Sequence, residues 1–62
     1  MALAKGVFRI DNEQSYDIYM EKNGRYYVTH WMLHRKLGIY EPSGTHRIAK
    51  DEYERMKEKY NG

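Results

Sequence analysis

The sequence predicts an α+β domain in which a small antiparallel sheet packs against a C-terminal helix. Three observations predict this fold class: an Asn23-Gly24 pair between two strand-like segments, a short strand-like segment at residues 45–48, and apolar residues at helical spacing after Lys50. The chain has 62 residues and no cysteine. A single small domain over residues 1–62, with no disulfide to support it, is therefore expected.

The first expected element is an edge strand at residues 7–10, where Val, Phe and Ile surround one arginine. The polar residues 11–15 are typical of a loop. The Asn23-Gly24 pair then predicts a hairpin, because both residues readily adopt the left-handed conformations of a type I′ turn. Its flanks, residues 16–21 and 25–29, are rich in aromatic and β-branched residues.

A two-residue turn also fixes the register of this hairpin. The expected cross-strand pairs are Lys22 with Arg25, Met20 with Tyr27, Tyr19 with Val28, and Ile18 with Thr29. We expect the face with Ile18, Met20, Tyr27 and Thr29 to point inward. The competing interpretation is a helix that begins at Ser15 and ends at Gly24.

Residues 29–37 fit two structures. Thr29 can cap a helix whose apolar residues share one face, and residues 31–34 can equally form a strand. Residues 41–44, Glu-Pro-Ser-Gly, predict a turn, and residues 45–48 a short third strand that returns from it.

The C-terminal helix is predicted from Lys50 onward. Acidic residues occupy its first turn and basic residues its last, which suits the helix dipole. Its apolar stripe, which we expect to pack on the sheet, consists of Ala49, Tyr53, Met56 and Tyr60.

Positive charge is concentrated in the middle of the chain. Residues 25–50 carry five cations against one carboxylate, a net charge of +4, whereas residues 1–24 and 51–62 each carry three cations against four carboxylates, a net charge of −1. If the five cations gather in the folded chain, they can displace counterions from nucleic-acid phosphates. The alternative is that folding disperses them. The predicted nucleic-acid-binding residues are Arg25, Arg35, Lys36, Arg47 and Lys50 for phosphates, with Trp31 and His34 as further contacts.

Metal binding and catalysis have little support. His30 and His34 would share a helix face, and His46 could complete an open zinc site, but no glutamate stands between the first two. Surface or packing roles are therefore favoured for these histidines. The two serines, Ser15 and Ser43, lie in no nucleophile motif, and the glycines form no phosphate-binding loop. We expect no enzyme activity, no metal and no cofactor.

Two resemblances favour DNA binding. Residues 44–56 resemble the wing strand and closing helix of excisionase-type winged helix-turn-helix proteins, which would make residues 29–36 a recognition helix. Strands at residues 16–22, 25–31 and 45–49 with a helix at 50–60 resemble the β-β-β-α modules of integrase arm-binding and plant-type DNA-binding domains, in which a three-stranded sheet enters the major groove.

The sequence thus favours a small DNA-binding or DNA-associated accessory protein, of the kind that phages and mobile elements carry. The alternative is a protein-binding module, such as a phage-type inhibitor that docks on a host or defence enzyme through aromatic residues. A homodimeric subunit is a third interpretation, since aliphatic residues are few. Residues 1–5 lack the apolar core of a secretory leader, and no apolar run is long enough for a membrane span, so a cytoplasmic location without membrane contact is expected.

Overall fold

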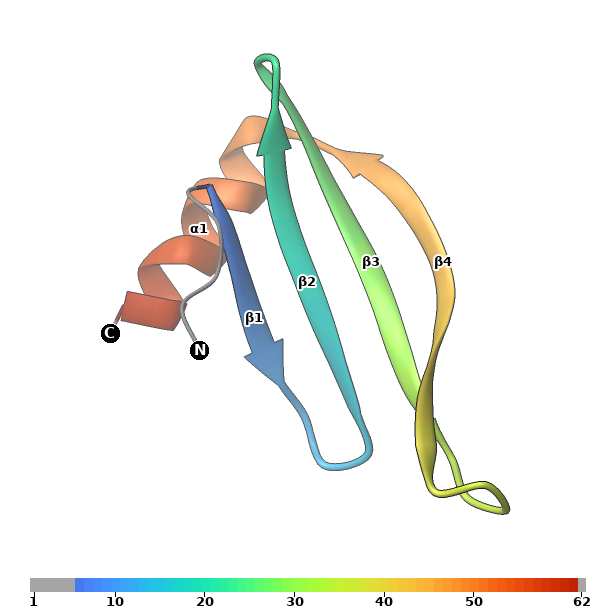
Figure 1. The fold of residues 1–62 in the computed structure, drawn as a ribbon. Helices are drawn as coiled ribbons and strands as arrows, with labels where there is room; N and C mark the ends of the chain where they lie inside the picture. Colours follow the sequence, from blue (N-terminus) through green and yellow to red (C-terminus); the bar gives the residue numbers. More distant parts are fainter. Residues whose placement is uncertain (1–5, 62) are drawn as a thin grey trace.

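The chain forms a four-stranded antiparallel sheet with one helix packed on it (Figure 1). The computed structural model describes residues 6–61; residues 1–5, on which the expected absence of a leader rests, lie outside this range. The strands follow one another across the sheet in chain order. The predicted α+β class is confirmed. The elements are β1 (Val7–Asp11), β2 (Ser15–Lys22), β3 (Arg25–His34), β4 (Ile39–Ile48) and α1 (Lys50–Asn61).

The β2–β3 hairpin has the predicted turn and register. Asn23 and Gly24 both adopt positive φ angles, 53° and 76°, as a type I′ turn requires. The Glu21 carboxylate accepts a hydrogen bond of 2.9 Å from the Gly24 backbone N–H. All four expected cross-strand pairs are present. The alternative helix over residues 15–24 is therefore wrong, and the expected edge strand is confirmed as β1, which pairs with β2.

The β3–β4 hairpin is longer than the sequence predicted. Residues 29–34 continue β3 as a strand, and the chain reverses at residues 35–38, where the Leu37 and Gly38 N–H groups bond the His34 carbonyl. The turn predicted at residues 41–44 is wrong, because this segment lies inside β4. The sheet accommodates it because β4 is an edge strand, where proline is tolerated, and because the register shifts opposite His30 and Trp31. The predicted third strand at residues 45–48 is the C-terminal part of β4.

The core lies between α1 and one face of the sheet. Each strand and the helix contribute one buried side chain: Phe8, Tyr19, Val28, Ile48 and Tyr53. The inward face expected for the β2–β3 hairpin is wrong, because Tyr19 and Val28 point toward the helix and their neighbours Ile18 and Thr29 point away. Phe8 and Ile48 lie on the same side as Tyr19 and Val28, and together they form the apolar surface on which Tyr53 packs.

Tyr53 attaches α1 to the sheet. Its ring lies 5.3 Å from the Phe8 ring and 4.7 Å from the Tyr26 ring, centroid to centroid, and its hydroxyl donates a 2.8 Å hydrogen bond to the Gly6 carbonyl. Burial, with a smaller effect from the Glu21 carboxylate, raises the pKa of the Tyr53 hydroxyl above its usual value of 10.0. The hydroxyl therefore keeps its proton at neutral pH and can donate.

The helix covers only one end of the sheet, and the β3–β4 hairpin extends beyond it (Figure 1). Large apolar side chains are exposed at the far end of this hairpin: Met32 (50%), Leu37 (63%), Ile39 (50%) and Tyr40 (40%). Within residues 6–61, no helix is long and apolar enough to cross a membrane.

Candidate nucleic-acid interface

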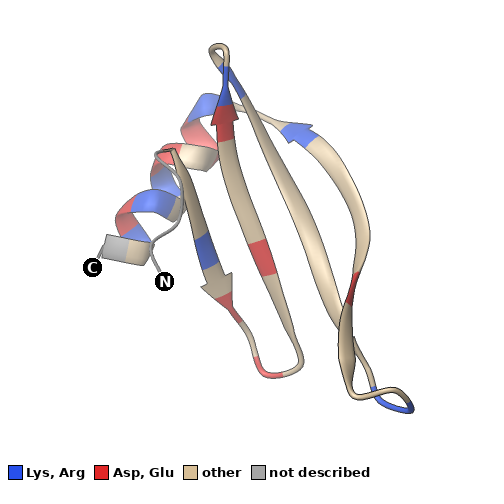
Figure 2. Ribbon diagram, viewed as in Figure 1, with Lys and Arg blue, Asp and Glu red and all other residues tan. Residues whose placement is uncertain are grey.

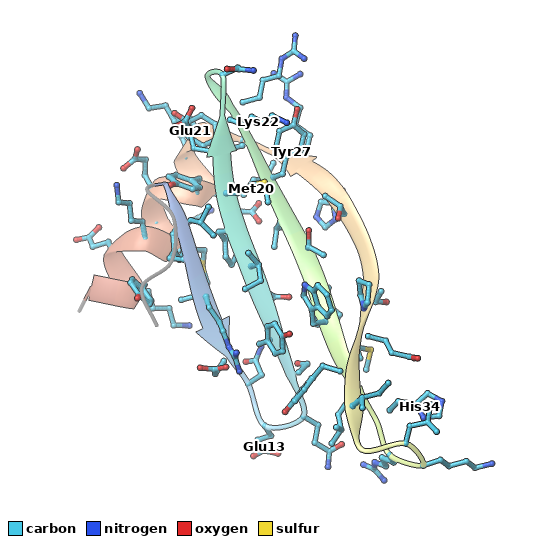
Figure 3. All side chains as sticks on the ribbon, in the orientation of Figure 1. Glu13, Met20, Glu21, Lys22, Tyr27 and His34 are labelled. Carbon is cyan, nitrogen blue, oxygen red and sulfur yellow. The ribbon has the colours of Figure 1, made fainter. Side chains whose placement is uncertain are left out.

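The second face of the sheet has no helix on it. Successive side chains of a strand point to opposite faces, and directly paired residues share a face. The registers therefore assign each strand residue to the helix side or to this second face, which we call the open face. Met20 and Tyr27 are neighbours on it (Figure 3). Its residues are Val7, Arg9, Asp11, Tyr16, Ile18, Met20, Lys22, Arg25, Tyr27, Thr29, Trp31, Leu33, Tyr40, Pro42, Thr45 and Arg47.

The strands separate their charges between the two faces. All four strand cations lie on the open face, whereas three of the four strand carboxylates lie on the helix side. With one carboxylate against four cations, the open face has a net charge of +3. The cations are Arg9, Lys22, Arg25 and Arg47, and the helix-side carboxylates are Asp17, Glu21 and Glu41.

Aromatic rings form a row across the open face. Tyr16 and Trp31 are a cross-strand pair whose ring planes lie within 9° of parallel, with centroids 5.7 Å apart. Tyr40 reaches over from β4, and its ring centroid lies 4.9 Å from that of Tyr16. On the other side, the Arg9 guanidinium lies 3.9 Å from the centroid of the Tyr16 ring and donates a 2.6 Å hydrogen bond to Asp11. Tyr16, Trp31 and Tyr40, one ring each from β2, β3 and β4, are hereafter the aromatic row, and Arg9 of β1 lies at its end.

The five cations predicted from the sequence do not form one cluster. Arg25 and Arg47 lie near Lys50, at the end of the sheet where the β2–β3 turn and the start of α1 meet. Arg35 and Lys36 lie in the β3–β4 turn, at the other end of β3 from Arg25. A strand rises about 3.3 Å per residue, so this turn is about 30 Å from Arg25. Figure 2 shows the two groups at opposite ends of the molecule, whose longest dimension is 37 Å.

The two groups have different surroundings. The Arg35 guanidinium donates a 2.6 Å hydrogen bond to the side chain of Gln14. At the other end, Lys22, Arg25 and Arg47 are exposed, and none of them is in an ion pair within residues 6–61. The end formed by Lys22, Arg25, Arg47 and Lys50, hereafter the basic end, has four cations, whereas the β3–β4 turn has two.

The two remaining predicted contacts are also separated. Trp31 lies in the aromatic row, on the open face. His34 points to the opposite face, near the β3–β4 turn and at the other end of the sheet from Lys22 (Figure 3). Its Nδ1 lies 3.4 Å from the Leu37 N–H, which donates to it, so His34 supports the turn.

The pairing of His30 and His34 that a helix would give does not form. His30 and His34 lie four residues apart on a strand, a separation of about 13 Å, which is too long for one metal ion. The Nδ1 of His30 instead lies 2.5 Å from a carboxylate oxygen of Asp17 on the neighbouring strand. Within residues 6–61, no group of three or more side chains is arranged to hold a metal.

Sequence reasoning missed several open-face residues, namely Arg9, Tyr16, Lys22 and Tyr27. The signal that could have found them is the alternation of charge along the strands. Once Asn23-Gly24 fixes the hairpin register, Lys22 and Arg25 share a face with Tyr27. The edge-strand residues Phe8 and Ile48, which pack with Tyr19 and Val28, then leave this face uncovered.

Comparisons with known proteins assign no family. No family model matches the chain, and neither a curated protein nor a solved structure does. The recognition helix implied by the winged helix-turn-helix resemblance is absent, because residues 29–34 are strand. The β-β-β-α layout of the second resemblance is present in β2, β3, β4 and α1, with β1 as a fourth strand.

Proposed function

We propose that this protein is a small DNA-binding accessory protein whose contact surface is the open face of the sheet together with the basic end. The observation that carries the proposal is the separation of charge: every strand cation lies on the uncovered face. Displacement of counterions from phosphates by such cations supplies most of the affinity in non-specific binding to nucleic acid. The contact surface is therefore one face of the sheet and its basic end, not the whole of residues 25–50. Arg35 and Lys36 lie outside this surface.

The surface combines the two kinds of group that nucleic-acid recognition uses. Cations at the basic end can position a phosphate backbone, and the aromatic row with Tyr27 can contact bases. A nucleic-acid-binding protein acts where the cell keeps its nucleic acid, so we also propose that it acts in the cytoplasm.

The direct test is the salt dependence of binding. A fluorescently labelled oligonucleotide is titrated with the protein, and anisotropy gives Kd at several salt concentrations between about 50 and 300 mM. If Lys22, Arg25 and Arg47 each contact one phosphate, log K should fall against log salt with a slope of about −2 to −3. Absence of binding at low salt and micromolar protein would contradict the proposal.

A second candidate function is docking on another protein. Four large apolar side chains are exposed beyond the helix, at the far end of the β3–β4 hairpin. Exposed groups of this size gathered at one place are typical of interaction surfaces. Sedimentation at two protein concentrations shows whether a second copy of the chain covers these side chains. If the protein is a monomer and binds no nucleic acid, another protein is favoured as the partner.

A further inference from the structure

Duplex and single-stranded nucleic acid present different surfaces to the aromatic row. In a duplex the bases are stacked on each other, and a protein reaches only their edges in the grooves. In a single strand the flat faces of the bases are free and stack on aromatic side chains. Tyr16 contacts both Trp31 and Tyr40, so the rings span three strands, on a face that no other element covers.

The width of the sheet disfavours insertion into a duplex groove. The major groove is about 12 Å wide and admits a helix or a two-stranded ribbon. Strands lie about 4.8 Å apart, so the backbones of β1 and β4 are separated by about 14 Å across the open face, before side chains are added. The aromatic row and Arg9 together extend across this full width and therefore suit a flat, open contact.

The polar groups in the middle of the open face also suit stacking better than edge recognition. The face has no asparagine or glutamine, the residues that pair with adenine edges. The hydroxyls of Thr29 and Thr45 lie 2.7 Å apart and bond to each other. Arg9 already contacts Tyr16 and Asp11. The middle of the face thus presents ring and aliphatic surface.

The cations lie beside the rings in a way that a single strand can follow. Arg25 and Trp31 lie on the same face of β3, six residues apart, which is about 20 Å along the strand. Arg47 lies opposite Tyr27, between these two positions. A flexible strand of several nucleotides can therefore run along the face, with the phosphates of some nucleotides at the basic end and the bases of others on Tyr27 and the aromatic row.

We propose that the preferred ligand is single-stranded nucleic acid, bound with its bases stacked on Trp31 and Tyr40. Tyr16 supports these two rings, because its own ring already contacts Trp31, Tyr40 and the Arg9 guanidinium. This inference rests on the proposed function and specifies its substrate class. Base stacking on aromatic side chains tolerates every base, so the protein binds single strands with little sequence preference.

The test compares one sequence in two forms. A labelled strand of about twelve nucleotides, long enough for a site of this kind, is titrated alone and as its duplex at the same salt concentration. We expect the single strand to bind about tenfold more tightly or better. The chain has one tryptophan, and its fluorescence should be quenched by the single strand as a base stacks on Trp31.

Substitutions separate stacking from charge. Trp31→Ala should weaken single-strand binding about tenfold, the usual loss for one stacked base, and leave the salt slope unchanged. Trp31→Phe should restore most of the affinity. Tyr40→Ala, at an exposed position of the edge strand, should weaken binding without loss of the fold, and circular dichroism checks each variant. Tyr60→Ala, an exposed tyrosine of α1, is the matched control and should bind normally.

The outcomes separate the two proposals. Duplex bound as tightly as single strand, with no quenching, overturns the stacking inference and leaves DNA binding through the open face in place. Binding of neither form overturns both and turns attention to a protein partner. Single-strand preference that is unaffected by Trp31→Ala and Tyr40→Ala overturns the assignment of the bases to the aromatic row.

Discussion

Replacing Tyr53 by alanine is expected to unfold a large fraction of the protein at 25 °C. The substitution removes a ring that contacts Phe8 and Tyr26, together with the hydrogen bond to Gly6. Large-to-small changes at buried aromatic positions cost about 3–5 kcal/mol. A core of this size rarely supplies more than about 3–5 kcal/mol of net stability. Urea denaturation followed by circular dichroism measures the free energy of unfolding.

Tyr60→Ala is the control on the same helix. Tyr60 belongs to the same apolar stripe but is 51% exposed, and its main contact is the Phe8 ring at 5.5 Å. A loss of about 1 kcal/mol is expected, as for an aromatic pair near the surface. Equal losses for the two variants would show that the helix does not dock through Tyr53.

Reversing two charges of the open face is expected to weaken nucleic-acid binding roughly fifty-fold at about 50 mM salt. Each phosphate contact contributes to the salt slope, and two fewer contacts reduce both the affinity and the slope. Arg25→Glu with Arg47→Glu makes this change at exposed positions of the basic end. Titration of a labelled oligonucleotide at several salt concentrations measures Kd, and the slope should rise to above −1.

The matched control places the same reversal on α1. Arg55→Glu with Lys57→Glu alters the net charge by the same amount, at exposed positions of the helix. If binding depends on the open face, this variant should lose only the small contribution of overall charge. Similar losses for both double variants would mean that net charge, and not the face, determines binding.

Local chemistry explains which parts of the fold the sequence predicts well. Asn23-Gly24 specifies the turn and the register, because few other residues adopt two consecutive left-handed conformations. The helix from Lys50 has both an apolar stripe and terminal charges that suit the helix dipole. Residues 29–37 were ambiguous because a short apolar run fits a strand or a helix equally, and pairing with β2 and β4 decides between them.

The inward face of the sheet depends on contacts between distant residues. Both faces of the β2–β3 hairpin carry apolar side chains, so its own composition does not choose between them. Phe8 and Ile48, from the two edge strands, place their side chains with Tyr19 and Val28, and this determines where α1 packs. The aromatic row follows from the same choice, because Tyr16 and Trp31 then remain on the uncovered side.

The central claim is that the open face is the surface that contacts nucleic acid. Nuclear magnetic resonance tests it most directly, by titration of an unlabelled single strand into isotopically labelled protein. We expect chemical-shift changes at Trp31, Tyr16, Tyr27, Arg25 and Arg47, and none at the exposed side of α1. Changes confined to α1 or to Met32, Leu37 and Ile39, or none at a saturating concentration of the strand, would contradict the claim.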